Sequence, residues 1–371
     1  MTIDVEITVT ERYSEGARER QEALCCPVDY DNSLLAMLPQ EIIERDYGCG
    51  DPSRYVQPGD VVLDLGSGGG KICYMAALLT GAGGQVIGVD MNDDMLALAR
   101  KYQAEMAGKL GGDRVRFVKG YIQDLALDVD ALGQYLAANP VRAHADYSAL
   151  KAWEQQQRRE APLIPDASVD LVISNCVLNL VADSEKQQLV QEIFRVLRPG
   201  GRIAISDIVS DRPVPQSMKQ DPDLWSGCIS GAFEESEFAD AFAAAGFSGV
   251  CYDKWDPQPW QVVEGISFRS VTLTAVKPAR GVANAENKAV MYRGPFAAVI
   301  DESGRRYDRG SHEAVSESTR ELLLNTAFGN AFIDLSNRTA TETAASCCGG
   351  PKTADIAEPD GRATSHGGCC G

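Results

Sequence analysis

The chain has 371 residues, enough for two or three domains, and its 53 acidic and 35 basic side chains give a formal net charge of −18. The basic residues form no long cluster, so the sequence does not favour a nucleic-acid partner. No apolar stretch reaches the roughly 18 residues that a membrane helix needs. With 44% apolar and 24% charged residues, the composition is that of a soluble globular protein. We therefore expect neither nucleic acid nor a membrane as a partner.

The first twenty residues and the cysteine content indicate a compartment and a chemistry. The start of the chain alternates apolar and polar residues, without the basic start and apolar run of a signal peptide, so we expect a cytoplasmic protein. In that compartment the 11 cysteines are thiols by default, which favours metal, metalloid or redox chemistry. A structural zinc site is not favoured, because the CxxC pairs and His pairs typical of zinc sites are absent from the sequence.

From about residue 60, short apolar runs alternate with turns and amphipathic stretches, as in a parallel sheet covered by helices. The predicted strands are, in chain order, 61–65, 85–89, 114–119, 169–174, 202–207, 250–254 and 268–276. Helices are predicted at 72–79, 92–107, 184–197 and 235–245. Five strands with crossovers and a final strand pair predict an α/β fold with a doubly wound, mostly parallel seven-stranded sheet.

Composition also divides the chain into four segments. Residues 1–58 precede the alternating pattern, and we expect them to fold over the edge of the sheet that carries the active site. Residues 59–278 form the sheet domain, with a polar, Ala-rich, helix-prone insertion at about 125–165. Residues 279–338 are expected to form a small β module, with short strands at 290–293, 297–300 and 305–308. Residues 339–371 contain cysteines among Thr, Ala, Ser and Gly, a composition that predicts a flexible tail.

A glycine-rich run, VLDLGSGGGK, lies between the first predicted strand and the helix after it. Its glycines let the backbone approach a ligand at the carboxyl edge of the sheet. The dinucleotide fingerprint G-x-G-x-x-G fails by one residue, because Lys71 occupies the place of the third glycine. The compact loop therefore suits a ligand without a pyrophosphate.

Asp90 closes the second predicted strand, where a carboxylate can accept hydrogen bonds from both hydroxyls of a ribose. The alternative interpretation is a glycine-rich turn followed by a capping aspartate. The alignment of the glycine loop, the strand ends and this acid favours a ribose-bearing cofactor instead.

The glycine loop and Asp90 resemble the first motif and the ribose acid of the class I S-adenosylmethionine-dependent methyltransferases, a resemblance that covers residues 60–278. It implies S-adenosylmethionine as cofactor. The adenine would lie near the end of the third strand and the sulfonium near the end of the fourth. The cofactor-binding residues implied in this way are Asp64, Gly66, Ser67, Gly68, Asp90, Met91, Tyr121, Ile122 and Asn175.

Cysteines follow two of the predicted strands at the same edge of the sheet. Cys176 comes directly after the fourth strand and Cys228 lies in the loop after the fifth, so their thiols are expected to converge beside the methyl donor. Cys49 precedes the first strand, in the segment expected to cover this edge. A lone cysteine is most often a small buried hydrophobe, which is what we expect of Cys73 and Cys251. The shared location of the other three favours a thiol site.

Several motifs together resemble the arsenite methyltransferase family, with a C-terminal extension: YGCG around Cys49, LGSGGG, GVDM at 88–91, SNCVxNL around Cys176 and LWxxC around Cys228. The resemblance implies that Cys49, Cys176 and Cys228 are catalytic and bind trivalent arsenic, with a further thiol supplied by Cys25 or Cys26. It also implies that the cysteines pass through a disulfide, which a thiol reductant such as thioredoxin or glutathione reduces.

The chemistry of these residues agrees with that family. Soft thiolates select soft acceptors, and three of them match the pyramidal geometry of trivalent arsenic while leaving its lone pair free. That lone pair carries no proton, so the reaction needs no general base. The expected function is methyl transfer from S-adenosylmethionine to thiol-bound arsenic, in detoxification or organoarsenical biosynthesis. The alternatives are a methyltransferase of a small organic metabolite and a non-catalytic protein that sequesters a metalloid.

Overall fold

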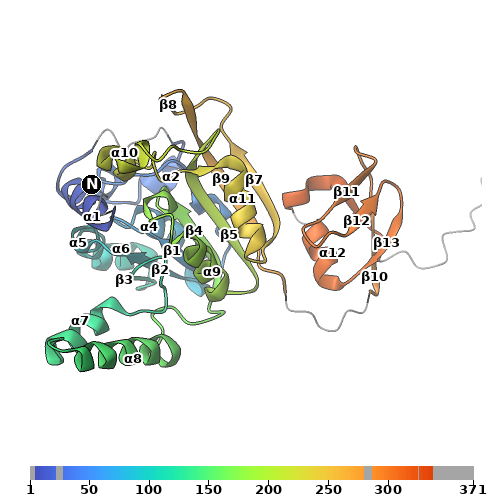
Figure 1. Ribbon diagram of the computed structural model, residues 1–371. Helices are drawn as coiled ribbons and strands as arrows, with labels where there is room; N and C mark the ends of the chain where they lie inside the picture. The colour runs from blue at the N-terminus through green and yellow to red at the C-terminus, as the bar shows by residue number, and fades with distance from the viewer. Residues whose placement is uncertain (1–4, 22–27, 280–285, 325, 337–371) are drawn as a thin grey trace, which may run out of the picture.

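The computed structural model describes residues 5–21, 28–279, 286–324 and 326–336, and its centre is a mixed β-sheet (Figure 1). The main strands lie in the order β3-β2-β1-β4-β5-β9-β7. The first five of these are parallel, and β9 runs antiparallel to both β5 and β7. Their bounds are β3 Val115–Lys119, β2 Gln85–Asp90, β1 Val61–Leu65, β4 Val169–Asn175, β5 Leu197–Ser210, β9 Ile266–Val276 and β7 Ser248–Trp255. The predicted doubly wound, mostly parallel sheet is confirmed.

Helices cover both faces of this sheet, which explains the continuous apolar runs of its central strands. Val62 of β1 packs into the core with α4 (Lys71–Thr80), α5 (Asp93–Lys101) and α6 (Gln103–Leu110). Its neighbour Leu63 points the opposite way, into the core with α9 (Lys186–Val196) and α11 (Glu235–Ala244). The predicted single helix 92–107 is wrong in one respect, because it is divided at Tyr102 into α5 and α6.

Further elements surround the carboxyl edge of the parallel strands. Three of them precede the sheet, namely α1 (Val5–Arg18), α2 (Asn32–Leu35) and α3 (Gln40–Glu44). The short helix α10 (Pro222–Ser226) and the two-residue strand β6 (Phe233–Glu234) follow β5, and β8 (Gln261–Val263) pairs with β9. Helix α1 packs against α5 and α10, as Figure 1 shows.

Two helices occupy the region predicted as an insertion. Helices α7 (Val129–Ala138) and α8 (His144–Glu160) follow β3 and project from the sheet domain (Figure 1). The rings of Tyr135 and Trp153 stack between them with centroids 4.6 Å apart. None of the helices within the described ranges combines the length and apolar character needed to cross a bilayer.

The C-terminal module has its own core and contains more than the expected strands. The predicted strands correspond to β10 (Lys288–Tyr292), β11 (Ala298–Ile300) and β12 (Arg306–Asp308). Strands β13 (His312–Val315) and β14 (Phe332–Asp334) flank β10, and α12 (Glu317–Leu324) packs against β14 and β10. The expectation of a purely β module is therefore incomplete. The predicted tail, 339–371, lies outside the described residues.

Candidate active site

A pocket lies at the carboxyl edge of the sheet, between the ends of β1, β2 and β4 and helix α1. Residues of the sheet domain that line it include Gly66, Gly68, Gly69, Asp90, Met91, Gly120, Tyr121, Ile122 and Cys176. The N-terminal segment closes it with Val5, Val9, Thr10, Tyr13, Asp46 and Tyr47. We call this the cofactor pocket, because the predicted glycine loop and ribose acid both line it.

The glycine loop has the backbone that only glycine adopts without strain. Gly66 has a φ of +67°, and a Cβ on it would lie 2.4 Å from a methyl carbon of Val177. Gly68 has a φ of +51°, and a Cβ there would meet no atom within 4 Å. The first glycine therefore permits close packing, whereas the second leaves open space for a ligand.

Asp90 is held at the end of β2 by two backbone groups. The N–H groups of Gly68 and Asn92 each donate to one of its carboxylate oxygens at 2.8 Å. Burial raises the pKa of Asp90 above its ordinary value, although these two hydrogen bonds oppose the shift. Each oxygen keeps a lone pair that can accept a ribose hydroxyl, so the donor set fits a nucleoside cofactor.

The predicted cofactor residues divide into two groups. Met91, Tyr121 and Ile122 line the pocket together with the glycine loop and Asp90. Asp64 lies beneath the loop, where Cys73 Sγ donates to its Oδ2 at 3.1 Å and burial raises its pKa to about 7.

Ser67 and Asn175 also lie behind the pocket lining. Both are buried, and the hydroxyl of Ser67 has no hydrogen-bond partner within the described ranges. Asn175 is bound instead to the loop that carries Cys49. Asn175 therefore supports the site through the Cys49 loop, whereas the Ser67 hydroxyl keeps its hydrogen-bonding capacity unused within the described ranges.

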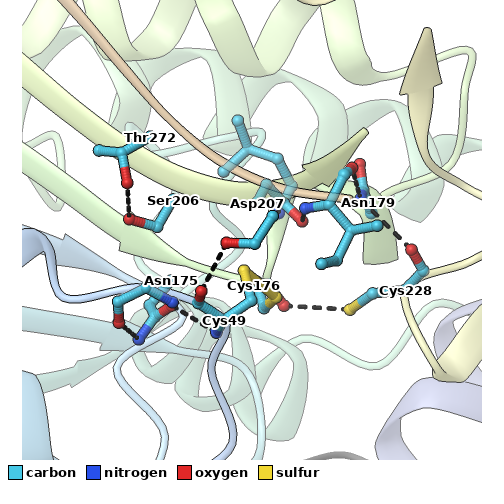
Figure 2. The surroundings of a disulfide bond; sticks show 12 residues. Cys49, Asn175, Cys176, Asn179, Ser206, Asp207, Cys228 and Thr272 are labelled. Atoms are coloured by element: carbon cyan, nitrogen blue, oxygen red, sulfur yellow. Dashed lines mark hydrogen bonds between the residues drawn. A yellow bond between two sulfur atoms is a disulfide. The ribbon is translucent and has the colours of Figure 1, made fainter. Parts of the chain in front are cut away.

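The three predicted cysteines lie together beside the cofactor pocket (Figure 2). Cys49 and Cys176 form a disulfide with their Cα atoms 5.9 Å apart. The thiol of Cys228 donates to the carbonyl oxygen of Cys176 at 3.2 Å. Cys25 and Cys26, the further predicted thiols, lie outside the described residues. The sulfur atoms of Cys49 and Cys176 and a carboxylate oxygen of Asp207 lie within 4.8 Å of one another, whereas the thiol of Cys228 adjoins this group through the backbone of Cys176.

The loop around Cys49 lies flat on the ends of β4 and β5. Asn175 Oδ1 accepts from the backbone N–H groups of Cys49 at 2.9 Å and Gly50 at 3.0 Å. A Cβ on Gly48 would lie 2.2 Å from the Asn175 amide nitrogen, and a Cβ on Gly50 would lie 2.4 Å from Ser206 Oγ. The glycines on either side of Cys49 are therefore required for this close approach.

Cys176 and Cys228 share an uncommon backbone conformation. Their φ angles are 60° and 62°, in the left-handed region that residues other than glycine rarely adopt. The N–H of Cys176 donates to the carbonyl oxygen of Ser206 at 2.8 Å, and the N–H of Cys228 donates to the carbonyl oxygen of Trp225 at 3.0 Å. Such conformations cost free energy and occur mainly where function requires a particular side-chain direction.

Sequence reasoning missed Asp207, whose carboxylate lies within 4.8 Å of the sulfur atoms of both Cys49 and Cys176. It accepts from the N–H groups of Leu178 at 2.9 Å and Ile208 at 2.8 Å, while burial raises its pKa to about 7. A signal was present, because Asp207 ends the fifth predicted strand at the edge where the thiols were expected.

A second, smaller pocket adjoins the thiols and was also missed. It is lined by Tyr13, Tyr47, Cys176, Ile208, Gly227, Cys228 and Trp260, and we call it the thiol pocket. Tyr13, Tyr47 and Cys176 line both pockets. The sequence analysis predicts no helix in residues 1–58, so it gave no reason to place the side chain of Tyr13 in the site.

A buried ion pair connects the glycine loop to the Cys49 loop. Lys71, the first residue of α4, pairs with Asp46, and its Nζ lies 3.7 Å from the ring centroid of Tyr30. Burial alone would lower the pKa of Lys71, but Asp46 and Tyr30 raise it above its ordinary value. The Tyr30 hydroxyl accepts from Asn175 Nδ2 at 3.2 Å. The residue that breaks the dinucleotide fingerprint thus joins the cofactor loop to the thiol loop.

Comparison with known proteins identifies the fold family. A family model described as a methyltransferase domain matches residues 57–135 and 137–246. The chain belongs to the class I S-adenosylmethionine-dependent methyltransferases. S-adenosylmethionine is therefore its cofactor, as predicted. A second model, a domain of unknown function (DUF8838), matches residues 279–362.

The most informative relatives are arsenite methyltransferases. One from Aquipseudomonas alcaligenes is 29% identical over 345 residues, which cover 86% of this chain and 86% of that protein. One from Halobacterium salinarum is 35% identical over 242 residues, 63% of this chain and 51% of the relative. The structure of an arsenic(III) S-adenosylmethionine methyltransferase from Chlamydomonas reinhardtii superposes with a TM-score of 0.56 at 28% identity. That match covers 83% of this chain and 96% of the other.

Proposed function

We propose that this methyltransferase transfers the methyl group of S-adenosylmethionine to trivalent arsenic held by Cys49, Cys176 and Cys228. The observation that carries the proposal is the convergence of these three cysteines, with Cys176 lining both the cofactor pocket and the thiol pocket. Similarity to arsenite methyltransferases from several organisms supports the same substrate.

The reduced cysteines would bind and orient the arsenic. Coordination displaces the thiol protons, so no neighbouring cation is needed to generate the thiolates. Three sulfur ligands leave the arsenic lone pair unshared, and because Cys176 lines both pockets, arsenic bound to it would lie beside the cofactor. When bound, S-adenosylmethionine supplies an electrophilic methyl group. The protein contributes mainly by holding the two reactants in the right orientation.

Redox balance gives the cysteines a second role. Forming an arsenic–carbon bond with the lone pair oxidises arsenic by two electrons. Two thiolates return these electrons by forming one disulfide, which restores trivalent arsenic in the methylated product. The disulfide between Cys49 and Cys176 supports this role, because the two sulfur atoms are within bonding reach while Cys228 remains a thiol. A dithiol protein of the thioredoxin type or glutathione would then reduce the disulfide by thiol exchange.

The test is turnover with product speciation. Pre-reduced protein is incubated with S-adenosylmethionine, a thiol reductant and As(III), and arsenic species are separated and quantified. We expect methylated arsenic from the natural chain and from a Cys251→Ser control, whose thiol lies in β7 beside Thr274. Cys49→Ser, Cys176→Ser and Cys228→Ser should each lose most of the product.

Three outcomes would contradict the proposal. Bound arsenic with no methylated product would indicate a sequestering protein. Methylated arsenic formed at the natural rate by all three serine variants would show that the thiols are incidental, and neither bound nor methylated arsenic in the natural chain would favour an organic metabolite as substrate.

A further inference from the structure

Helix α1 contacts both halves of the proposed site. Val5, Val9 and Thr10 line the cofactor pocket, whereas Tyr13, one turn further along, lines the cofactor pocket and the thiol pocket. Val5, Val9 and Tyr13 follow one another at intervals of four residues, and Thr10 precedes Tyr13 by three, so the four side chains share one face of the helix. That face covers the cofactor pocket at one end and the thiols at the other.

The middle of α1 is held by the loop that follows Asp90. The side-chain amide of Asn92 donates to the carbonyl oxygen of Thr10 and to Ser14 Oγ, both at 3.0 Å. Asn92 also caps α5, since its Oδ1 accepts from the N–H of Met95. The helix is therefore attached, through Asn92, to the loop beside Asp90, where the ribose of the cofactor would bind.

The same helix is attached to the loop that carries Cys228. Arg12 Nη1 donates to the carbonyl oxygen of Asp223 at 3.0 Å and to Ser226 Oγ at 2.8 Å, both in α10. Cys228 follows α10 by two residues and keeps its left-handed backbone against Trp225. Tyr13 lies beside Cys228, where burial and the neighbouring thiol raise the pKa of its hydroxyl well above the ordinary value. Tyr13 and Cys228 also line the same thiol pocket, so the tyrosine is placed to hold this cysteine.

Helix α1 is docked by polar contacts more than by apolar burial. Gly16 and Ala17 are the only residues of the helix that are buried as a whole, although the hydroxyl end of Tyr13 is enclosed, and the last turn is held by Tyr47, whose hydroxyl donates to Gly16 O at 3.0 Å. Segments with little buried apolar surface open at low free-energy cost. A ligand that contacts the docked helix will therefore shift the population towards docking.

We propose that α1 couples the two sites: cofactor binding docks α1, and docked α1, through Arg12 and Tyr13, holds Cys228 in place as the third sulfur ligand. Arg12 and Tyr13 are positioning residues in this scheme. The coupling requires no contact between the cofactor and Cys228, which does not line the cofactor pocket. By linkage, a thiol-pocket ligand that favours docked α1 must tighten cofactor binding by the same factor. The identity of that ligand as arsenic rests on the proposed function, but the coupling itself does not.

The experiment measures the accessibility of each thiol without arsenic. Pre-reduced protein is alkylated with iodoacetamide with and without saturating S-adenosylhomocysteine, and rates for Cys176, Cys228 and Cys251 are read by peptide mass spectrometry. We expect S-adenosylhomocysteine to slow alkylation of Cys228 at least about fivefold in the natural chain, the lower end of usual coupling factors. Cys251 serves as the unaffected thiol. Cys176 lines the cofactor pocket, so its protection reports occupancy.

Three variants decide the interpretation. Arg12→Ala and Tyr13→Phe should keep the protection of Cys176 but reduce that of Cys228 to less than about twofold. The exposed neighbour Glu11→Gln should behave like the natural chain. Protection of Cys228 that is unchanged in both Arg12→Ala and Tyr13→Phe would overturn the coupling, and so would protection of Cys176 alone in the natural chain. Because no arsenic is present, a failed turnover assay would refute the proposed substrate without deciding this result.

Discussion

Replacing Asp90 with alanine tests the cofactor site at the carboxylate that is predicted to bind the ribose. The carboxylate accepts one backbone N–H from Gly68 and one from Asn92. The substitution therefore removes both the acceptors for the ribose and the tie between the loop and the end of β2. We expect weaker binding of S-adenosylmethionine and of S-adenosylhomocysteine.

The magnitude follows from the number of hydrogen bonds. A hydrogen bond to a charged group contributes about 1.5 to 3 kcal/mol, and the two ribose hydroxyls supply two of them. Since about 1.4 kcal/mol corresponds to a factor of ten, loss of even one such bond weakens binding at least about tenfold. The raised pKa of Asp90 adds a pH dependence: affinity should fall on acidification at a higher pH than for an exposed aspartate, because the proton removes the charged acceptor.

Isothermal titration calorimetry with S-adenosylhomocysteine measures this effect without turnover. Asp93→Asn is the matched control, since Asp93 lies three residues away at the start of α5 and pairs with Lys119 at 2.6 Å. Asp90→Asn keeps the size of the side chain but loses its charge and one of its two acceptor oxygens, so it should also bind the ligand more weakly than the natural chain. An unchanged dissociation constant in Asp90→Ala would show that the ribose does not bind at this carboxylate.

Three further predictions concern the groups that support the site. Lys71→Met should lower the free energy of unfolding by about 3–5 kcal/mol in denaturant titrations because it leaves Asp46 buried without its partner, and Asp46→Leu in the same chain should restore part of it. The folded state keeps a proton on Asp64, whose pKa rises from 3.8 to about 7, so this group's contribution to stability is complete below pH 3.8 and is lost as pH rises towards 7. Asp64→Asn should flatten the pH dependence of the free energy of unfolding by about 1.4 kcal/mol per pH unit over that range, whereas an unchanged slope would contradict the assignment. Asn175→Ala should lower kcat at least about tenfold by releasing the Cys49 loop while cofactor affinity is kept; a loss of affinity would instead favour a direct contact with the cofactor.

The sheet was predictable because its strands are buried on both faces and bounded by turns. The predicted strand 61–65 matches β1 residue for residue. Strand β5 is longer than the predicted 202–207, because β4 pairs with it at Leu197 and β9 continues to pair with it as far as Ser210. Those partners lie far away in the chain, so a local pattern does not reveal them.

Helix α1 shows where local reasoning fails. Its sequence begins with the run VEITVT, rich in β-branched residues that have low helix propensity and here alternate with polar ones. The helix is stabilised by packing on α5 and α10, by the hydrogen bond from Asn92 to Thr10, and by the hydrogen bond from its own Arg12 to Ser226. These partners lie far away in the chain, so a local stretch of sequence does not reveal them. The placement of Cys176 and Cys228 at one edge could be predicted because parallel strands end there, and the same argument could have found Asp207, whereas Tyr13 required the folded chain.

Arsenic K-edge X-ray absorption on the pre-reduced chain with one equivalent of As(III) tests the central claim most directly. The three converging cysteines predict arsenic with three sulfur neighbours in the natural chain and in Cys251→Ser, and with one sulfur fewer in Cys228→Ser. Oxygen neighbours around arsenic in the natural chain, or an unchanged sulfur count in Cys228→Ser, would contradict the three-thiolate site.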